Sequence, residues 1–263
     1  MKHRHFFEFI DQSWVPALFR NAITQITQFN IDFLKIYDPI STKIDELIKI
    51  TGCNQIIDLC SGSSGPWPRL ITQIASPVKV ILTDKFPNLK KWEQVAQNSD
   101  GNIGYSKTPV DVHSIPDDLN GIRTIFTGFH HFKPEDAKNF LIQTVARDQP
   151  IAIFEFTERN LSSMLRGLVL FILLPFIQIP FIKPRSLAVF FWTYCIPLIP
   201  ILHYWDGLVS NMRTYSANEL WEIVNGADWR KYHWEVGAQP IQTFGMKGNI
   251  TYLIGYNPHF PDH

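Results

Sequence analysis

Residues 55–67 constrain the fold more than any other stretch of the chain, and they read Gln-Ile-Ile-Asp-Leu-Cys-Ser-Gly-Ser-Ser-Gly-Pro-Trp. An apolar run that ends on a carboxylate, Asp58, is typical of a buried strand. Pro66 suits the first turn of a helix, which we expect over residues 66–75. The small residues between Asp58 and Pro66 let the backbone approach a ligand closely, and a helix start offers unpaired N–H groups. The stretch therefore predicts a strand–loop–helix nucleotide site. Asp58 would repel a pyrophosphate but attract an amino group, which favours a ligand with an amino-acid end over a dinucleotide.

These residues resemble the first motif of the class I S-adenosylmethionine-dependent methyltransferases, which reads roughly Asp-Leu-Gly-x-Gly-x-Gly. Asp58 and Leu59 match the motif. Cys60, Gly62 and Ser64 stand at its three glycine positions, so two of the three glycines are replaced by other small residues. The alternative is a serine- and glycine-rich turn after any buried strand.

The resemblance implies an α/β fold: a Rossmann-like three-layer sandwich with a seven-stranded, mostly parallel sheet whose last strand is antiparallel. N-terminal helices and an apolar helical cap inserted after the fifth strand would complete it. The length of 263 residues suits one such domain with an insertion. We divide residues 1–263 into an N-terminal helical part (1–52), a cofactor-binding core (53–159), the cap insertion (160–215) and a closing helix and hairpin (216–263).

Composition excludes several classes of partner. Lysine plus arginine equals aspartate plus glutamate, 24 each, so no overall field favours nucleic acid. Three cysteines at unrelated spacings predict neither a metal cluster nor a disulfide framework. The first residues have charges but no uninterrupted apolar run, unlike a secretory signal. We therefore expect a cytoplasmic protein, with membrane association left open.

An acid also ends the second expected strand, residues 78–84. Asp84 follows Asp58 by 26 residues, a separation that fits one strand–helix–strand unit. The resemblance implies that Asp84 accepts hydrogen bonds from the ribose hydroxyls and that Asp111 lies near the adenine, although Asp111 also suits a plain turn. A carboxylate like Asp84 would suit the ribose of NAD as well. The implied cofactor is S-adenosylmethionine, with contacts from Asp58, Cys60, Ser61, Gly62, Ser64, Asp84, Asp111, Val112 and Thr127.

Residues 121–132 read as a fourth strand that runs into a loop containing His130 and His131. In the resembling family this loop lies beside the methyl group, which makes both histidines candidate catalytic residues. Imidazole titrates near neutral pH, so one of them could act as a general base. The alternative is that one merely caps the helix expected over residues 134–146. A fifth strand, residues 150–156, would bring Glu155 to the same carboxyl edge, where ligands of open α/β sheets bind.

The N-terminal residues 6–36 have apolar side chains at helical spacing, with Pro16 expected to break or start a helix. A second amphipathic helix is expected over residues 41–50, with Ser41 or Thr42 as its N-cap. The resemblance implies that these helices cover the substrate end of the sheet. Ordinary packing is the alternative.

Residues 161–205 contain two strongly apolar runs, 167–182 and 187–202, separated by Lys183-Pro184-Arg185. Each run is shorter than the roughly 20 residues that a membrane-spanning helix needs, and prolines interrupt both. A spanning hairpin would also carry Lys183 and Arg185 across the membrane. We therefore expect a cap that lies on a membrane face or roofs an apolar pocket. A pair of spanning helices is the alternative.

The last part of the chain predicts a helix with a Ser216–Glu219 capping box, followed by strands at residues 234–241 and 250–256. Gly245 and Gly248 suit the turn between these strands. Asp206 and Arg213, which follow the cap, are candidates either for the pocket or for an internal salt bridge. A closing antiparallel hairpin is typical of the resembling family and unusual in nicotinamide-binding sheets.

The sequence thus predicts methyl transfer from S-adenosylmethionine to a small, apolar or membrane-derived acceptor. Because the sulfonium already activates the methyl group, the protein mainly has to align the acceptor and exclude water. We expect no metal and no nucleic acid, and peripheral membrane contact through residues 161–205. The alternatives are a non-catalytic protein of the same fold that binds the cofactor or a lipid, and an NAD-dependent oxidoreductase, which Asp58 and the closing hairpin disfavour.

Overall fold

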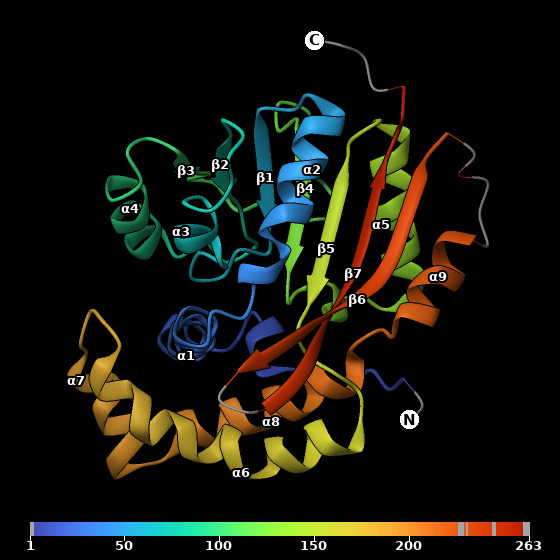
Figure 1. The fold of residues 1–263 in the computed structure, drawn as a ribbon. Coiled ribbons are helices and arrows are strands. Elements are labelled where there is room, and N and C mark those ends of the chain that lie inside the picture. The colour runs from blue at the N-terminus through green and yellow to red at the C-terminus, as the bar shows by residue number, and fades with distance from the viewer. Residues whose placement is uncertain (1–2, 226–228, 230, 244–245, 260–263) are drawn as a thin grey trace.

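A computed structural model describes residues 3–225, 229, 231–243 and 246–259. Its strands are β1 (Gln55–Leu59), β2 (Lys79–Leu82), β3 (Ile103–Tyr105), β4 (Ile122–Phe126), β5 (Ile151–Glu155), β6 (His233–Thr243) and β7 (Met246–Tyr256). They form one sheet in the order β3-β2-β1-β4-β5-β7-β6 (Figure 1). β1 to β5 are parallel, whereas β7 is antiparallel to β5 and β6. The predicted mostly parallel sheet with an antiparallel last strand is confirmed.

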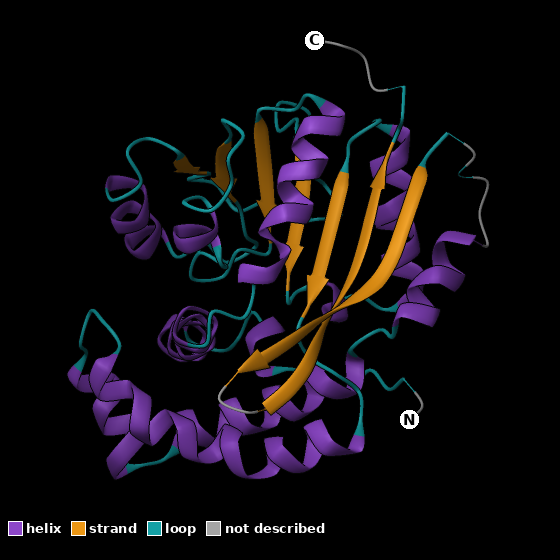
Figure 2. Ribbon diagram, in the orientation of Figure 1, coloured by secondary structure: helices purple, strands orange, loops and turns teal. Residues whose placement is uncertain are grey.

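Helices lie on both sides of the sheet and beyond its carboxyl edge (Figure 2). The α-helices are α1 (Ala17–Phe33), α2 (Ser41–Thr51), α3 (Trp67–Leu70), α4 (Leu89–Gln97), α5 (Pro134–Ala146), α6 (Leu161–Gln178), α7 (Leu187–Phe190), α8 (Leu198–Arg213) and α9 (Ala217–Asn225). The shorter helical turns are η1 (Phe9–Asp11), η2 (Asp38–Ile40), η3 (Phe129–His131), η4 (Ile179–Phe181) and η5 (Phe191–Cys195).

Both faces of the parallel strands are buried, which explains their nearly unbroken apolar sequences. Neighbouring residues of β1 point to opposite faces: Ile56 belongs to the core cluster that includes side chains of α2, α3 and α4, and Ile57 to the cluster with α5 and α9. Both isoleucines are 0% exposed. The two clusters form the interfaces of the predicted three-layer sandwich.

Local signals fix several helix ends. α1 begins directly after Pro16, as expected. Asn88 caps α4 by accepting a hydrogen bond from the backbone N–H of Lys91. At the start of α9, Ser216 and Glu219 bond reciprocally, since the Glu219 carboxylate accepts from Ser216 and the Ser216 hydroxyl accepts from the Glu219 N–H. The predicted capping box is therefore present.

Three local predictions were wrong or incomplete. The helix expected over residues 66–75 has only four residues in α3, because Thr72 and Gln73 donate to carbonyls three residues back and the chain tightens into turns. Ser41 is the first residue of α2 rather than its cap, and its hydroxyl donates to the Asp38 carbonyl. Gly248 lies within β7 opposite Ile241, while Gly245 falls outside the described residues.

The carboxyl ends of β1, β4 and β5 point toward α1 and the cap, which lie together beyond this edge of the sheet (Figure 1). We use "cap" for residues 161–205, from the start of α6 into α8. The inner side of the cap packs on α1: Ala22 and Ile26 of α1 share an apolar cluster with Ile179 and Ile199. The N-terminal helix α1 and the cap therefore cover the carboxyl edge of the sheet as one layer.

α6 and α8 lie close together because two glycines make room for one ring. A Cβ atom at Gly167 or at Gly207 would lie 2.7 Å from the ring of Phe171. His203 of α8 also bonds to the Phe171 carbonyl, with Nδ1 at 2.8 Å. α6 and α8 thus pack closely against each other.

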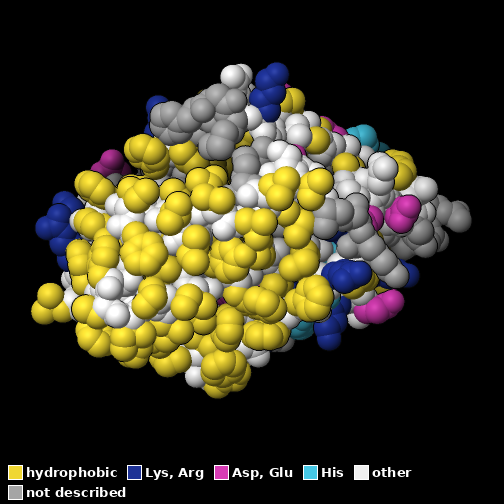
Figure 3. Space-filling view, turned by 90° about the horizontal axis from the view of Figure 1, so that it is seen from below, with side chains coloured by type: hydrophobic (Ala, Val, Ile, Leu, Met, Phe, Trp, Pro, Cys, Tyr) yellow, Lys and Arg dark blue, Asp and Glu magenta, His cyan; other side chains and the backbone are white. Residues whose placement is uncertain are grey.

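The outer side of the cap is apolar and exposed, and Figure 3 shows this face from below. On α6 the exposed positions recur at helical spacing. They are Leu161, Leu165, Leu168, Val169, Leu173 and Ile177. Among the described residues, no single helix is both long and apolar enough to cross a membrane; the segments Leu187–Cys195 and Leu198–Arg213 qualify only together and are bent by 79°.

Candidate functional site

The loop after β1 turns sharply through residues with left-handed backbone angles. Cys60, Gly62 and Gly65 have φ values of 57°, 52° and 55°. Glycine adopts this conformation freely, but Cys60 carries a Cβ atom there and is strained. The loop is tied to the neighbouring strand, since Ser61 N–H donates to the Thr83 carbonyl at 3.0 Å. The tight turn expected at the first glycine position forms without that glycine.

Asp58 lies at the end of β1, but its carboxyl group faces the protein interior. Oδ2 accepts from the Ser61 hydroxyl at 2.6 Å and Oδ1 from the Thr124 hydroxyl at 2.7 Å. The residue is 1% exposed, and burial raises the pKa of its carboxyl to about 7 although both hydroxyls lower it. Asp58 therefore shapes the loop, and direct contact with a ligand remains a prediction.

Asp84 follows β2 and turns its carboxylate to the same loop. Oδ2 accepts from the Gly62 N–H and Oδ1 from the Phe86 N–H, each at 2.8 Å. α1 covers this region: the Thr24 hydroxyl accepts from Ser63 at 3.1 Å, and the Arg20 guanidinium lies 4.3 Å from the centre of the Phe86 ring. The structure thus brings together the two carboxylates predicted from the sequence on either side of the small-residue loop.

The other predicted cofactor residues lie around these. Asp111 pairs with Lys85 at 3.0 Å, and its pKa is lowered because hydrogen bonds from His113 and Lys85 outweigh burial. Val112 is half-buried against the core. Thr127 has a left-handed backbone and hydrogen-bonds through its hydroxyl to Tyr37. Ser64 is fully buried with no partner for its hydroxyl among the described residues.

His130 and Glu155 form a buried pair at the ends of β4 and β5. Nδ1 of His130 lies 2.8 Å from Oε2 of Glu155, and both side chains are 1% exposed. Glu155 Oε1 also accepts the backbone N–H groups of Phe129 and His130, at 2.6 and 3.2 Å. Burial raises the pKa of Glu155, but the imidazole and these donors lower it below its ordinary value. Nε2 of His130 has no hydrogen-bond partner among the described residues.

His131 is held differently, by an ion-pair network. Its Nδ1 lies 2.8 Å from Oδ1 of Asp11, and the other oxygen of Asp11 accepts from Arg213 at 2.8 Å. Burial lowers the pKa of His131, but the charges of Glu8 and Asp11 outweigh it and raise the pKa to about 10. At neutral pH His131 is therefore an imidazolium, which has no free lone pair with which to act as a base.

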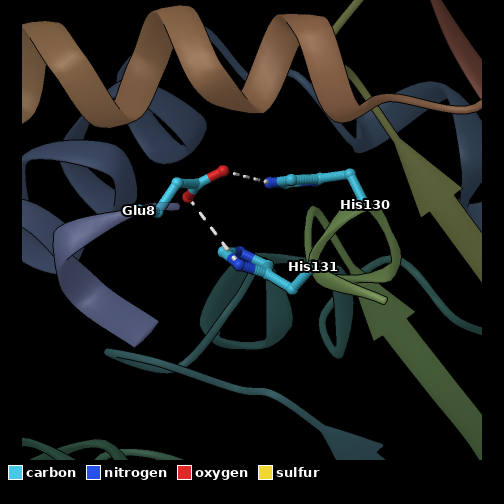
Figure 4. A group of neighbouring side chains, drawn as sticks. All are labelled: Glu8, His130 and His131. Atoms are coloured by element: carbon cyan, nitrogen blue, oxygen red, sulfur yellow. Dashed lines mark ion pairs between the residues drawn. The ribbon is translucent and has the colours of Figure 1, made fainter. Parts of the chain in front are cut away.

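Glu8 reaches the two histidines from the N-terminal segment, and Figure 4 shows one oxygen of its carboxylate directed at each of them. Oε1 lies 3.7 Å from His130 Nε2, and Oε2 lies 3.7 Å from His131 Nδ1. Glu8 is 0% exposed and pairs with Arg213 at 3.2 Å. Glu8 is not among the site residues predicted from the sequence. The signal for it is a lone charge inside an apolar run, Phe-Phe-Glu-Phe-Ile.

Solved structures with this fold include methyltransferases. The chain is similar to the plantazolicin methyltransferase BpumL in complex with SAH, with a TM-score of 0.53 and 12% identity over 90% of this chain and 95% of that one. The chain has the fold of the class I S-adenosylmethionine-dependent methyltransferases. An O-methyltransferase family protein from Burkholderia thailandensis has a TM-score of 0.49 and 13% identity over 88% of this chain and 59% of that one. No family model and no curated protein matches the sequence.

Within this methyltransferase fold, the remaining predicted pocket residues serve to hold the N-terminal segment. Asp206 accepts from the backbone N–H groups of Phe9 and Ile10 at 2.7 and 3.2 Å. Burial raises its pKa to about 7, and the charge of Glu8 adds to this. Arg213 pairs with Glu8 and Asp11. The two hollows described on the surface both border Ile241 and Gln242 and include none of the predicted cofactor residues.

Proposed function

We propose that the chain transfers the methyl group of S-adenosylmethionine to a small, apolar acceptor, with His130 as the general base. The observation that carries this proposal is the buried His130–Glu155 pair, which stands at the carboxyl edge with Nε2 unpartnered among the described residues. It adjoins the β1 loop, because a Cβ atom on Gly128 would lie 3.0 Å from the Cβ atom of Cys60. A base beside the cofactor loop is the arrangement that methyl transfer with proton removal requires.

The residues of the β1 loop fit the cofactor chemically. S-adenosylmethionine, when bound, supplies a methyl group already activated by the sulfonium. Asp84 offers a carboxylate to ribose hydroxyls, and the backbone of residues 60–65 offers a close approach. In the present arrangement Asp84 accepts the Gly62 N–H and Thr24 lies on the loop, so the loop and α1 have to separate on binding.

Glu155 determines which nitrogen of His130 can accept a proton. A carboxylate accepts hydrogen bonds only, so Nδ1 carries the hydrogen toward Glu155 and Nε2 keeps its lone pair. The same carboxylate would stabilise the imidazolium that forms when Nε2 takes the acceptor's proton. Glu155 therefore orients the base and compensates its charge.

We also propose that the cap contacts a membrane surface, from which an apolar acceptor is drawn. Its outer side exposes large apolar side chains from α6 to η5. Between Arg159 and Asp206 the sequence has no Asp or Glu, whereas Lys183 and Arg185 are exposed at the turn between the apolar runs. Such a surface suits anionic head groups. Lys183 and Arg185 would each contribute about 1 kcal/mol of binding free energy near an anionic membrane.

Calorimetry with S-adenosylhomocysteine tests the cofactor. Wild type should bind it, and Asp84→Asn should weaken binding roughly tenfold or more, since a charged hydrogen bond is worth on the order of 1.5–3 kcal/mol. Asp118→Asn, at an exposed acid, is the control. No binding by wild type, or equal affinity in Asp84→Asn, would remove the cofactor from the proposal.

Vesicle flotation tests the membrane contact. Wild type should float with anionic vesicles, and the double variant Lys183→Glu/Arg185→Glu should float less, because the new charges are repelled by the head groups. Neutral vesicles should retain less of the wild type than anionic ones do. If the wild type does not float with vesicles in the absence of detergent, the membrane proposal is wrong and the cap covers a pocket instead.

A further inference from the structure

Two buried polar atoms of neighbouring side chains in the site have no hydrogen-bond partner among the described residues. Nε2 of His130 and Oε2 of Glu8 accept or donate no hydrogen bond among the described residues, although their side chains are 1% and 0% exposed. The other oxygen of Glu8, Oε1, accepts from the Ser210 hydroxyl at 3.2 Å and lies 3.7 Å from Nε2, too far for a direct hydrogen bond. Oε2 lies 3.7 Å from Nδ1 of His131. Buried polar atoms are almost always satisfied, so these two indicate the position of a ligand group.

The group that fits there must donate hydrogen. Because Nδ1 of His130 gives its hydrogen to Glu155, Nε2 can only accept while the ring is neutral. Glu8, paired with Arg213, offers carboxylate oxygens, which also only accept. An amine can donate a hydrogen to each residue and a hydroxyl can donate to one of them, whereas a carbonyl or an ether can donate to neither.

A metal ion would also bind to lone pairs, since Glu8, His130 and His131 are of metal-ligating type and lie close together (Figure 4). However, Nη1 of Arg213 lies 3.2 Å from Oε1 of Glu8 and 3.3 Å from Nδ1 of His131. The guanidinium already provides the positive charge at this place. A metal ion would have to displace the guanidinium from the same oxygen and nitrogen atoms.

The charges around the site favour some acceptors over others. Glu8, Asp11 and Glu155 bring three carboxylates, against the cations of Arg213 and His131. These five groups sum to one negative charge, and Asp206 beside the N-terminal segment adds to it once ionised. In a buried site this excess disfavours a further anion strongly.

We infer that Glu8 and His130 together hold the reacting group of the acceptor, that this group is a hydroxyl or an amine, and that acceptors with a carboxylate or phosphate beside it are excluded. The inference rests on the proposed function. The acceptor's oxygen or nitrogen forms the bond to the methyl carbon with its lone pair, and the electron pair of the broken carbon–sulfur bond stays on sulfur. The proton of the acceptor passes to Nε2, and Glu155 and Glu8 flank the resulting imidazolium.

Three probes share the same apolar body and differ only in their polar group: para-butylphenol, para-butylbenzylamine and para-butylbenzoate. Thermal shift and equilibrium binding with the full chain need no turnover, and formation of S-adenosylhomocysteine gives the rate. Wild type should bind the phenol and the amine at least about tenfold more tightly than the benzoate. Equal affinity for all three, or no binding of any, would overturn the inference.

Glu8→Gln removes the negative charge of Glu8 but keeps the size of the side chain. It should bind the benzoate about tenfold better than wild type does and should lower kcat for the phenol, with a changed pH–rate profile, because the imidazolium loses one carboxylate. Glu8→Asp, the second variant, keeps the charge and should still reject the benzoate while holding the phenol less tightly. Glu46→Gln, at an exposed acid of α2, should behave as wild type. Unchanged discrimination in Glu8→Gln would refute the assignment.

Two further outcomes are distinct. If Zn²⁺ or Mn²⁺ stabilises wild type and Glu8→Gln abolishes this, the place is a cation site and the inference is wrong. If S-adenosylhomocysteine does not bind while the probes are still discriminated, the proposed function fails and the acceptor site stands.

Discussion

Nδ1 of His130 lies 2.8 Å from Oε2 of Glu155, and the other oxygen of the same carboxylate accepts the backbone N–H of His130 at 3.2 Å. Glu155 therefore holds both the ring and the main chain of one residue. Since β4 and β5 are adjacent in the sheet, the pair has a rigid support on both sides. This arrangement fixes the tautomer of the imidazole without help from a ligand.

Replacing Glu155 by glutamine tests the role of this pair. The amide of the introduced glutamine can donate to Nδ1 and so move the hydrogen to Nε2, which would then be unable to accept a proton. We expect kcat of Glu155→Gln to fall roughly 100-fold or more, the usual size of a general-base contribution, with the affinity for S-adenosylhomocysteine unchanged. Steady-state kinetics and calorimetry measure the two. Glu158→Gln, at the same sheet edge, is the control, and equal loss in both variants would indicate a structural effect.

Cys60 tests the strain in the β1 loop. At φ 57°, a residue with a Cβ atom pays about 1–2 kcal/mol that glycine does not. Cys60→Ala keeps this cost and removes the thiol, whereas Cys60→Gly removes both. In chemical denaturation, we expect the free energy of unfolding of the glycine variant to exceed that of the alanine variant by about 1 kcal/mol. If alanine is as stable as glycine, the loop is not strained.

Asp58 should make stability depend on pH. Burial raises the pKa of its carboxyl from 3.8 to about 7. Between these values the folded protein keeps a proton that the unfolded chain has lost, so the free energy of unfolding falls as the pH rises toward 7. Asp58→Asn should remove this loss. The free energy of unfolding of the variant should therefore rise relative to that of wild type between about pH 5 and pH 8.

The gain should be on the order of a few kcal/mol, at about 1.4 kcal/mol per pKa unit. Asp206, whose pKa burial also raises to about 7, contributes in the same sense to both proteins and cancels in the comparison. Urea denaturation at the two pH values gives the difference directly. A constant difference between variant and wild type would mean that Asp58 is ionised in the folded protein.

The fold could be predicted because its signals are local. Each parallel strand is an apolar run that ends at a polar residue, as in β1 before its small-residue loop, and the closing hairpin follows from alternation near the C-terminus. α3 was predicted too long because turn formation after Leu70 depends on packing rather than on composition. Periodicity therefore gives the elements but not all of their ends.

The site was predictable only where its residues follow the strands. Asp84 and His130 come shortly after β2 and β4, so their place at the carboxyl edge follows from the topology. Glu8 reaches the site through contacts of the N-terminal segment with α8. The apolar run around Glu8 indicates that it is buried but does not encode these contacts. The orientation of Asp58 toward Ser61 and Thr124 is likewise a tertiary fact.

The outer side of α6 provides the last prediction. Leu168 and Leu173 are 45% and 50% exposed, although a soluble helix normally turns such residues inward. In the membrane proposal they enter the apolar region of the bilayer, and each leucine contributes about 1.5–3 kcal/mol when fully buried. Leu168→Glu/Leu173→Glu should therefore abolish flotation with anionic vesicles. The affinity for S-adenosylhomocysteine should stay unchanged, because these side chains point away from the sheet.

Ile142→Glu is the matched control, because Ile142 is also 44% exposed but lies on α5, which covers a face of the sheet. It adds an acid to an exposed helix without touching the cap, and it should float as wild type does. If both variants lose flotation, added negative charge alone explains the result. If neither does, the apolar side of α6 faces something other than lipid, and a second protein surface becomes the better candidate, which sedimentation without vesicles would reveal as self-association of the wild type.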